Sequence, residues 1–357
     1  MKRNTKSALT NKKGGLLVSS VFYRLKTLVY LVSLLCLFFS FAPGVFAAYP
    51  QRNINWILTS APGGGTDAWG RKLASVMERT LGRRIILNNM VGAGGATGTV
   101  HVWQARHDGY TLSTANDSTP SFAVMTGMQQ TMSSNWEFFI AGGSPGVLSV
   151  NTESGFKDFS TLLEEARRQP GRIKVASAAG SVWFVQAAVL DRYCGLPLGS
   201  VPIAGTQPAI LSCVAGETTA VIASIGEVAD FVRAGRLIPL VTMKDKDYEL
   251  EGFGTIPSIL TYLPAYEPFL PLKQWQGFMV PVNTPDNVKA VLHDAFVAAM
   301  ESQEMEDFRM SNHAVFYNLT GKEALDFAAR SESVTSWLLY EMNLAQHSPE
   351  KFGIPRP

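Results

Sequence analysis

The chain has 357 residues, 46% of them hydrophobic, and a formal charge of +2. Its charge is uneven, because residues 1–26 hold seven basic side chains and no acidic one. An apolar run from Leu28 to Ala42 follows, and Val45 and Ala47 then place small residues at the −3 and −1 positions of a signal peptidase site. This order predicts a secretory signal peptide over residues 1–47, cleaved after Ala47, and a periplasmic location.

A membrane anchor is the alternative, but the apolar run falls short of the ~20 residues that a spanning helix needs. Removing 47 residues leaves 310, without seven of the 31 basic residues and with all 29 acidic ones, so the mature formal charge is −5. The basic character of the full chain belongs to the signal, and we expect no nucleic-acid partner. The remaining length suits one large domain or two medium ones.

The mature chain alternates strand and helix signals. In order, we expect a strand at Ile54–Leu58, a helix from Thr66 to Gly82, a strand at Arg84–Asn88, the glycines of Gly92–Gly98, a helix to about Arg106, and strands at Tyr110–Thr114 and Val147–Val150. Next come a strand at Ile173–Ser177, the loop Ala178–Ser181, a helix to about Cys194, a strand at Val201–Ile203, a helix from Pro208 to Gly216, and strands at Thr219–Ala223 and Leu237–Met243.

The last part of the chain is predicted to be helical. Thr284 and Pro285 are expected at the N-cap and first position of one helix, and Thr320 with Glu323 as the capping box of another. The proline-rich segment Pro257–Pro271 reads as a crossover loop. Strands alternating with helices favour an α/β fold with parallel sheets covered by helices. Cys194 and Cys213 could pair in an oxidising compartment or remain two buried free thiols.

Three motifs resemble catalytic sites and fail on their chemistry. The first glycine loop, Ala61–Asp67, lacks the lysine of a phosphate-binding loop and has Thr66-Asp67 in its place. The glycines at 92–95 follow their strand too late for a dinucleotide fingerprint. Gly142–Gly146 has the spacing of a hydrolase elbow, but Pro145 has no N–H to donate to an oxyanion. The five histidines are scattered without ligand spacing, so we expect no metal and no cofactor.

The glycine loops are better explained as anion sites. A strand that ends in glycines and opens a helix presents free N–H groups at the positive end of the helix dipole. The first glycine loop and the loop Ala178–Ser181 could clamp a small carboxylate from two sides of a cleft. Asp67 is either a first-turn acid that favours the helix dipole or a contact to the ligand.

Ordered motifs along the mature chain resemble the solute receptors of the tripartite tricarboxylate transporter family, the TctC-like or Bug-type periplasmic binding proteins. The motifs are Tyr49-Pro50, Ala61–Asp67 with Arg71, Gly82-Arg83, Asn89, Gly92–Gly95, Asp108–Leu112, Pro170-Gly171, Gly180-Ser181, Val201-Pro202 with Gly205 and Pro208-Ala209, Ala234–Leu237, Ile256-Pro257, Gly277-Phe278, Val280-Pro281 and Thr284-Pro285.

The resemblance implies a two-domain periplasmic binding protein of type II, each domain a mainly parallel sheet covered by helices, with the ligand in the interdomain cleft. The implied domains are 48–150 with 272–357, and 151–271. The implied partners are a small organic carboxylate and the membrane subunits of a tripartite transporter, and we expect a monomer. The implied ligand-binding residues are Ala61, Pro62, Gly63, Gly64, Gly65, Thr66, Asp67, Ala179, Gly180, Ser181, Trp183, Gly205 and Ser224.

The chain departs from the family at three places: arginine is common there after Asn89, and basic residues are common where Ala204 and Phe184 stand here. Together with Trp69 and Trp183 near the loops, this predicts a carboxylate with an apolar or aromatic body rather than citrate. For Trp69 and Trp183 the alternative is packing in the core. Two other functions stay open: a secreted α/β enzyme acting on a small carboxylate, and a ligand sensor that signals to a membrane kinase. The missing nucleophile–base pair favours a receptor over an enzyme.

Overall fold

The computed structural model describes residues 26–30, 49–119, 121, 125, 127, 131–270 and 272–357. The chain divides into two compact units, Met1–Ala48 and Tyr49–Pro357. Residues 26–30 are helical and are the part of the first unit that is described, so the expected cleavage site lies outside the described residues. Over the described ranges, no helix combines the length and the apolar character that crossing a membrane requires.

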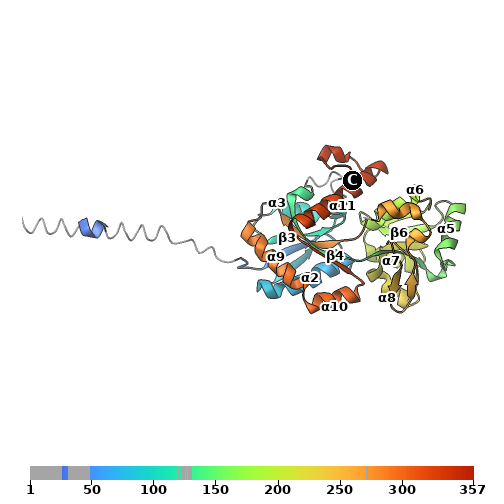
Figure 1. The fold of residues 1–357 in the computed structure, drawn as a ribbon, viewed down its shortest axis with the longest axis horizontal. Coiled ribbons are helices and arrows are strands. Elements are labelled where there is room, and N and C mark those ends of the chain that lie inside the picture. Colours follow the sequence, from blue (N-terminus) through green and yellow to red (C-terminus); the bar gives the residue numbers. More distant parts are fainter. Residues whose placement is uncertain are drawn as a thin grey trace, which may run out of the picture. The chain divides into compact units, whose positions relative to one another are not determined.

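The second unit contains two α/β lobes, each built on its own sheet (Figure 1). The sheet of the first lobe has six strands in the order β13-β4-β12-β3-β1-β2. They span Ile54–Leu58 (β1), Ile85–Asn89 (β2), Thr111–Asn116 (β3), Trp136–Gly143 (β4), Gln276–Pro281 (β12) and Val315–Leu319 (β13). β1 runs parallel to β2 and β3, whereas β12 and β13 pair antiparallel with their neighbours.

Helices cover both faces of this sheet, and β1 shows why. Trp56 and Leu58 belong to one apolar cluster, with side chains of α2 (Gly65–Leu81) and α9 (Asp286–Met300). Ile57 belongs to another, with side chains of α3 (Ala96–Gln104) and α11 (Gly321–Glu341). Successive side chains of a strand point to opposite faces, so a strand such as β1, with apolar side chains on both faces, needs cover on both. A further helix, α10 (Gln303–Ser311), contacts α2 and α9.

The second lobe has a five-stranded sheet in the order β7-β6-β8-β5-β9. Its strands are Gly146–Asn151 (β5), Lys174–Ala178 (β6), Gly199–Ile203 (β7), Ala220–Ser224 (β8) and Leu237–Thr242 (β9). Its helices are Phe159–Arg168 (α5), Val182–Tyr193 (α6), Thr206–Val214 (α7) and Ile225–Arg233 (α8), and a hairpin joins Tyr248–Leu250 (β10) to Gly254–Ile256 (β11). Here too one apolar cluster lies on each face of the sheet.

Two short segments connect the lobes and lie against each other. The chain leaves β4 and enters β5 through Ser144-Pro145, and it returns through residues 272–275 into β12. The backbone N–H of Ser144 donates a hydrogen bond to Oε1 of Gln274 at 3.1 Å. α11 contacts β4 in the first lobe and α6 in the second. The connections therefore place the carboxyl ends of strands from both lobes around one space.

The fold class is confirmed as two-lobed α/β, but the sheets are mixed rather than mainly parallel. β12 runs antiparallel to β3, and β5 runs antiparallel to β8 and β9, because the chain changes lobe just before each of these strands. Residues 146–150, expected in the first domain, therefore belong to the second sheet. The remaining domain limits stay a prediction.

Several helix starts also differ from expectation. α2 begins at Gly65 with Gly64 as its N-cap, so Thr66 is not the cap. α9 begins at Asp286, and Thr320 precedes α11 without a side-chain capping bond. The proline-rich segment contains two short 3₁₀ helices, Ile259–Thr261 and Pro264–Phe269.

Both cysteines of the second unit are buried free thiols. Burial raises the pKa of Cys194 to about 11 and that of Cys213 to about 12, so neither thiol is ionised at neutral pH. Of the two alternatives for this pair, the structure supports the free thiols.

Candidate ligand site between the lobes

The first glycine loop is fixed by a network centred on Asp67. Its carboxylate accepts hydrogen bonds from the Gly63 N–H at 3.0 Å, from the Arg71 guanidinium at 2.8 and 2.9 Å, and from the Asn89 amide at 2.8 Å. Burial alone would raise the pKa of Asp67, but these bonds, led by that from Arg71, hold it below its usual value. The carboxylate points into its own loop, so the contacts of Asp67 within the described residues hold the glycine loop in place.

The facing loop opens α6 in the second lobe. The Ser181 hydroxyl donates to the Ala178 carbonyl at 2.7 Å, and Gly180 adopts a positive φ of 79°, which favours glycine. The first N–H of α6, that of Val182, donates to the Asp117 carboxylate at 3.0 Å. Asp117 lies just after β3 of the first lobe, so this bond crosses between the lobes.

The second interlobe contact is the reciprocal of the first. Glu227, in the first turn of α8, accepts a hydrogen bond on Oε1 from the Gly65 N–H at 2.9 Å. Gly65 is the first residue of α2. Each lobe therefore supplies an acid that caps the glycine-loop helix of the other lobe. Burial raises the pKa of Asp117 to about 7, and it also raises that of Glu227.

A cavity of about 340 Å³ lies between these loops. Four helical segments begin at its wall: α2, α6, α7, and the 3₁₀ turn Ala93–Gly95 that leads into α3. Its lining is made of small and polar residues: Thr59–Pro62, Gly64–Thr66, Val91–Gly95, Asn116, Ser118, Ala178–Ser181, Ala204–Pro208, Glu227 and Gln274. Among the described lining residues, Glu227 is the single charged side chain, and none is aromatic.

The helix starts at this cavity share a feature that suits an anion. None of the N-cap residues of α2, α3, α6 and α7, which are Gly64, Gly95, Ser181 and Gly205, caps its helix with a side chain. By contrast, Ser224 caps α8 and Ser302 caps α10. The N–H groups of Thr66, Thr206 and Gln207 have no hydrogen-bond partner within the described part of the chain. Converging, unpaired N–H groups at helix N-termini favour a bound carboxylate.

The structure brings together nine of the thirteen predicted ligand-binding residues. Those that line the cavity are Ala61, Pro62, Gly64, Gly65, Thr66, Ala179, Gly180, Ser181 and Gly205. Gly63, Asp67, Trp183 and Ser224 do not line it. Trp183 is buried in the core of the second lobe, where its ring lies against Gly146, and Ser224 points its hydroxyl at Glu227.

Trp69 also lies in the core, edge-on to Phe308 at 5.1 Å between ring centroids. Neither of these tryptophans lines the cavity, and neither does Phe184. The prediction of an aromatic ligand body therefore loses the observation on which it rested. The described cavity lining does lack basic side chains, as the sequence led us to expect.

Sequence reasoning missed several lining residues. Asn116 and Ser118 follow a parallel strand at its carboxyl end, where open α/β sheets bind ligands, and this rule could have found them. The second glycine loop, at residues 92–95, is one of the family motifs but is not among the predicted ligand-binding residues, yet it lines the cavity. Glu227 and Gln274 carry no local signal, because only the packing of the two lobes brings them to the cavity.

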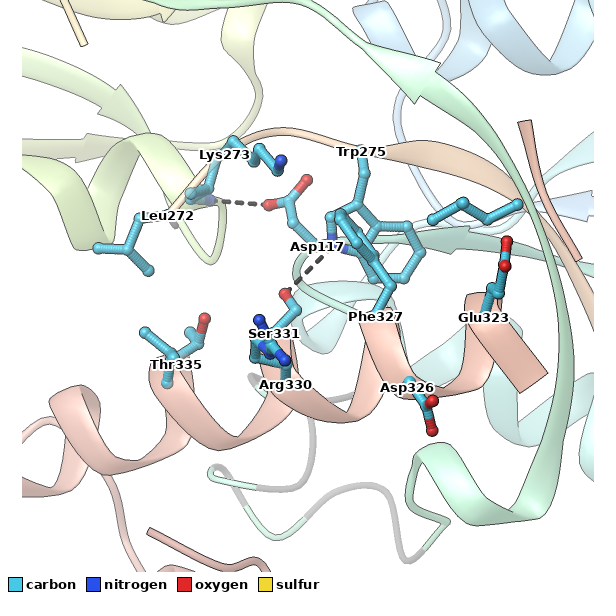
Figure 2. Close-up of a pocket in the computed structure, with 13 residues that line it drawn as sticks. Asp117, Leu272, Lys273, Trp275, Glu323, Asp326, Phe327, Arg330, Ser331 and Thr335 are labelled. Carbon is cyan, nitrogen blue, oxygen red and sulfur yellow. Dashed lines mark hydrogen bonds between the residues drawn. The ribbon is translucent and has the colours of Figure 1, made fainter. Parts of the chain in front are cut away.

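A second and larger cavity, of about 510 Å³, lies between α11 and the returning connection. Figure 2 shows Asp117, Lys273 and Trp275 on one side of it and the α11 residues Phe327 and Ser331 on the other. Asp117 lines this cavity, whereas its neighbours Asn116 and Ser118 line the first. The starts of α6 and α11 lie at its lining together with three carboxylates, Asp117, Glu323 and Asp326. Four helical segments begin at the smaller cavity, whose described lining has one carboxylate, so we assign the ligand to the smaller cavity.

Comparisons with known proteins agree with this architecture. The model of the family described as tripartite tricarboxylate transporter family receptor matches residues 70–344. A UPF0065 protein of Pseudomonas sp. strain P51, from the tcbD-tcbE intergenic region, is 30% identical over 245 residues, which are 68% of this chain and 71% of that protein.

Two solved structures share the fold. One, described as a periplasmic transporter, has a TM-score of 0.74 at 25% identity and covers 84% of this chain and 99% of its own. The other is MatC of Rhodopseudomonas palustris with bound malate, with a TM-score of 0.72 at 22% identity, covering 82% of this chain and all of its own. The second similarity concerns the fold alone.

Proposed function

Since the chain belongs to the tripartite tricarboxylate transporter receptor family, we propose that it captures a small organic carboxylate in the periplasm and delivers it to the membrane subunits of such a transporter. The observation that carries this proposal concerns the helix N-termini around the interlobe cavity: their own N-cap residues supply no side-chain cap, and the N–H groups of Thr66, Thr206 and Gln207 have no partner within the described part of the chain. An export signal cleaved after Ala47 is part of the same proposal, motivated by the basic, apolar and small segments in order.

The cavity also supports a limit on the ligand. Its volume of about 340 Å³ is at the small end of ligand sites, which suits a short organic acid. One carboxylate can be held by backbone N–H groups alone, but further carboxylates need cations or more donors. Because the described lining has no Lys, Arg or His, we propose a ligand with a single carboxylate. MatC, a neighbour by fold, was solved with malate, and a dicarboxylate of that kind is the natural competitor to test.

The first experiment is to purify the protein from periplasm, release its ligand by denaturation and identify it by mass spectrometry. The emptied protein is then screened by thermal shift against mono-, di- and tricarboxylates. We expect a monocarboxylate to raise the melting temperature most. Stabilisation by uncharged or basic compounds alone would overturn the proposal, and conversion of the bound acid into a product would indicate the enzyme instead.

Delivery needs a second readout. Deletion of this gene and, separately, of the membrane subunits should each abolish uptake of the radiolabelled acid that the screen identifies. Uptake that survives loss of the receptor but requires the membrane subunits would contradict the delivery role.

A further inference from the structure

Glu227 brings a carboxylate from the second lobe to the first N–H of α2, where a ligand carboxylate would otherwise be expected. Its Oε1 accepts from the Gly65 N–H at 2.9 Å, and its Oε2 accepts from the Ser224 hydroxyl at 2.6 Å. A Cβ placed on Gly65 would lie 3.3 Å from both the carboxyl carbon and Oε1 of Glu227. The glycine at position 65 therefore leaves room for this acid.

The carboxylate is anchored and also faces the ligand space. Ser224 holds it from behind, because the same hydroxyl accepts the Glu227 backbone N–H at 3.3 Å. Gln274 is the neighbour on the other side, with its amide nitrogen 3.5 Å from the Gly65 Cβ position. The side chain is only partly buried, and it lines the cavity that we assign to the ligand.

Two physical consequences follow for any ligand. The cavity holds a fixed acid and no described basic side chain, so a second ligand carboxylate placed near Glu227 would meet like charge without compensation. A carboxylate has about four acceptor sites, and two of those of Glu227 are used, so it can still accept a hydrogen bond from a ligand. A donor on the ligand would make such a bond, and a bond to a charged acceptor is among the stronger ones.

We propose that Glu227 sets the ligand class: it selects a small monocarboxylate that carries a hydroxyl or ammonium donor and rejects dicarboxylates. This inference rests on the proposed receptor function. The single ligand carboxylate lies on the unpaired N–H groups of α2 and α7, and the donor points at Glu227. A hydroxy acid and an amino acid share this chemistry, so the experiment has an arm for each.

The test compares probes that differ by one group, by isothermal titration calorimetry on the emptied protein. Propionate carries no donor, lactate adds a hydroxyl, alanine adds an ammonium, and succinate adds a second carboxylate. We expect lactate or alanine to bind wild type at least tenfold more tightly than propionate, with succinate the weakest. Glu227→Gln keeps an acceptor for the Gly65 N–H but removes the charge, so succinate should bind at least tenfold more tightly than to wild type.

Ser302→Ala is the matched control, because it removes the side-chain cap of α10, outside the described cavity lining, and leaves Glu227 and its partners in place. It should keep the wild-type order of probes even if its melting temperature falls. The inference is overturned if succinate binds wild type most tightly, or if Glu227→Gln, folded by its melting curve, leaves the order of probes unchanged. In both cases binding of carboxylates persists and the receptor function stands. Binding of no carboxylate at all would overturn the receptor function and this inference with it.

Discussion

Replacing Gly64 by valine would place a branched side chain at the mouth of the first glycine loop. Gly64 has φ −81° and ψ 171°, an extended conformation that valine adopts readily. A Cβ there would meet only the Ala61 carbonyl oxygen, at 3.8 Å, so the change adds bulk to the cavity without a clash in the fold. The valine methyl groups would then cover N–H groups at the start of α2.

The expected loss follows from the contacts at stake. Losing one hydrogen bond to a charged group costs about 1.5–3 kcal/mol. That range corresponds to about 10- to 150-fold weaker binding. The free energy of unfolding should fall by only about 1 kcal/mol, because valine is a poorer N-cap than glycine by that amount. For a chain of this size, such a loss lowers the melting temperature by no more than ~4 °C.

Calorimetric titration with the carboxylate that most stabilises wild type measures the effect. Ser302→Ala is the control. The Ser302 hydroxyl caps α10 by accepting a hydrogen bond from the Met305 N–H at 3.2 Å, and Ser302 lies outside the described cavity lining. It should cost similar stability and no affinity. If Gly64→Val binds as tightly as wild type, the ligand does not lie on this loop and the assignment of the cavity is wrong.

Three further changes test the surroundings of the site. Asp117 has a pKa of about 7 in the folded protein against an ordinary 3.8, so its contribution to stability is present at low pH and is lost as the pH rises to 7. Relative to wild type, the free energy of unfolding of Asp117→Asn, measured in urea, should therefore rise by on the order of 2 kcal/mol from pH 5 to pH 8. Parallel pH profiles of the two proteins would argue against this. Trp183→Ala should lower the free energy of unfolding by about 3–5 kcal/mol, because the ring is buried. The folded variant should keep its affinity for the ligand within threefold, and a large loss of affinity would indicate that Trp183 contacts the ligand. N-terminal sequencing of the exported protein should begin at Ala48, and an intact residue 1 in the membrane fraction would contradict cleavage.

The sequence predicted the site best where a feature depends only on residues that are neighbours in the chain. Three glycines between a buried strand and an amphipathic pattern predict an open helix start, and Gly64 and Gly65 line the cavity at the start of α2. The same kind of signal identified Gly180, whereas Gly205 came from the family resemblance. In the structure both are positive-φ glycines between a strand and a helix.

The prediction failed where the answer depends on packing. α6 is apolar on most of its surface, so its sequence does not reveal which face meets the cavity, and Trp183 turned out to lie in the core. Glu227 lies in a first helical turn, where an acid is common for dipole reasons alone. Its role at the cavity depends on Gly65, which is 162 residues away in the chain. The antiparallel strands likewise result from the chain changing lobes, which no local pattern records.

The reciprocal caps bear on how easily the two lobes can part. Separation would deprive α2 and α6 of the acceptors on Glu227 and Asp117, but it would also return both carboxylates to water. The hydration gained offsets much of the hydrogen bonding lost, so these contacts add little net preference for either arrangement. For the proposed receptor, we therefore expect the free energy of ligand binding to set the population of the closed form, so that closure would report whether the protein is loaded.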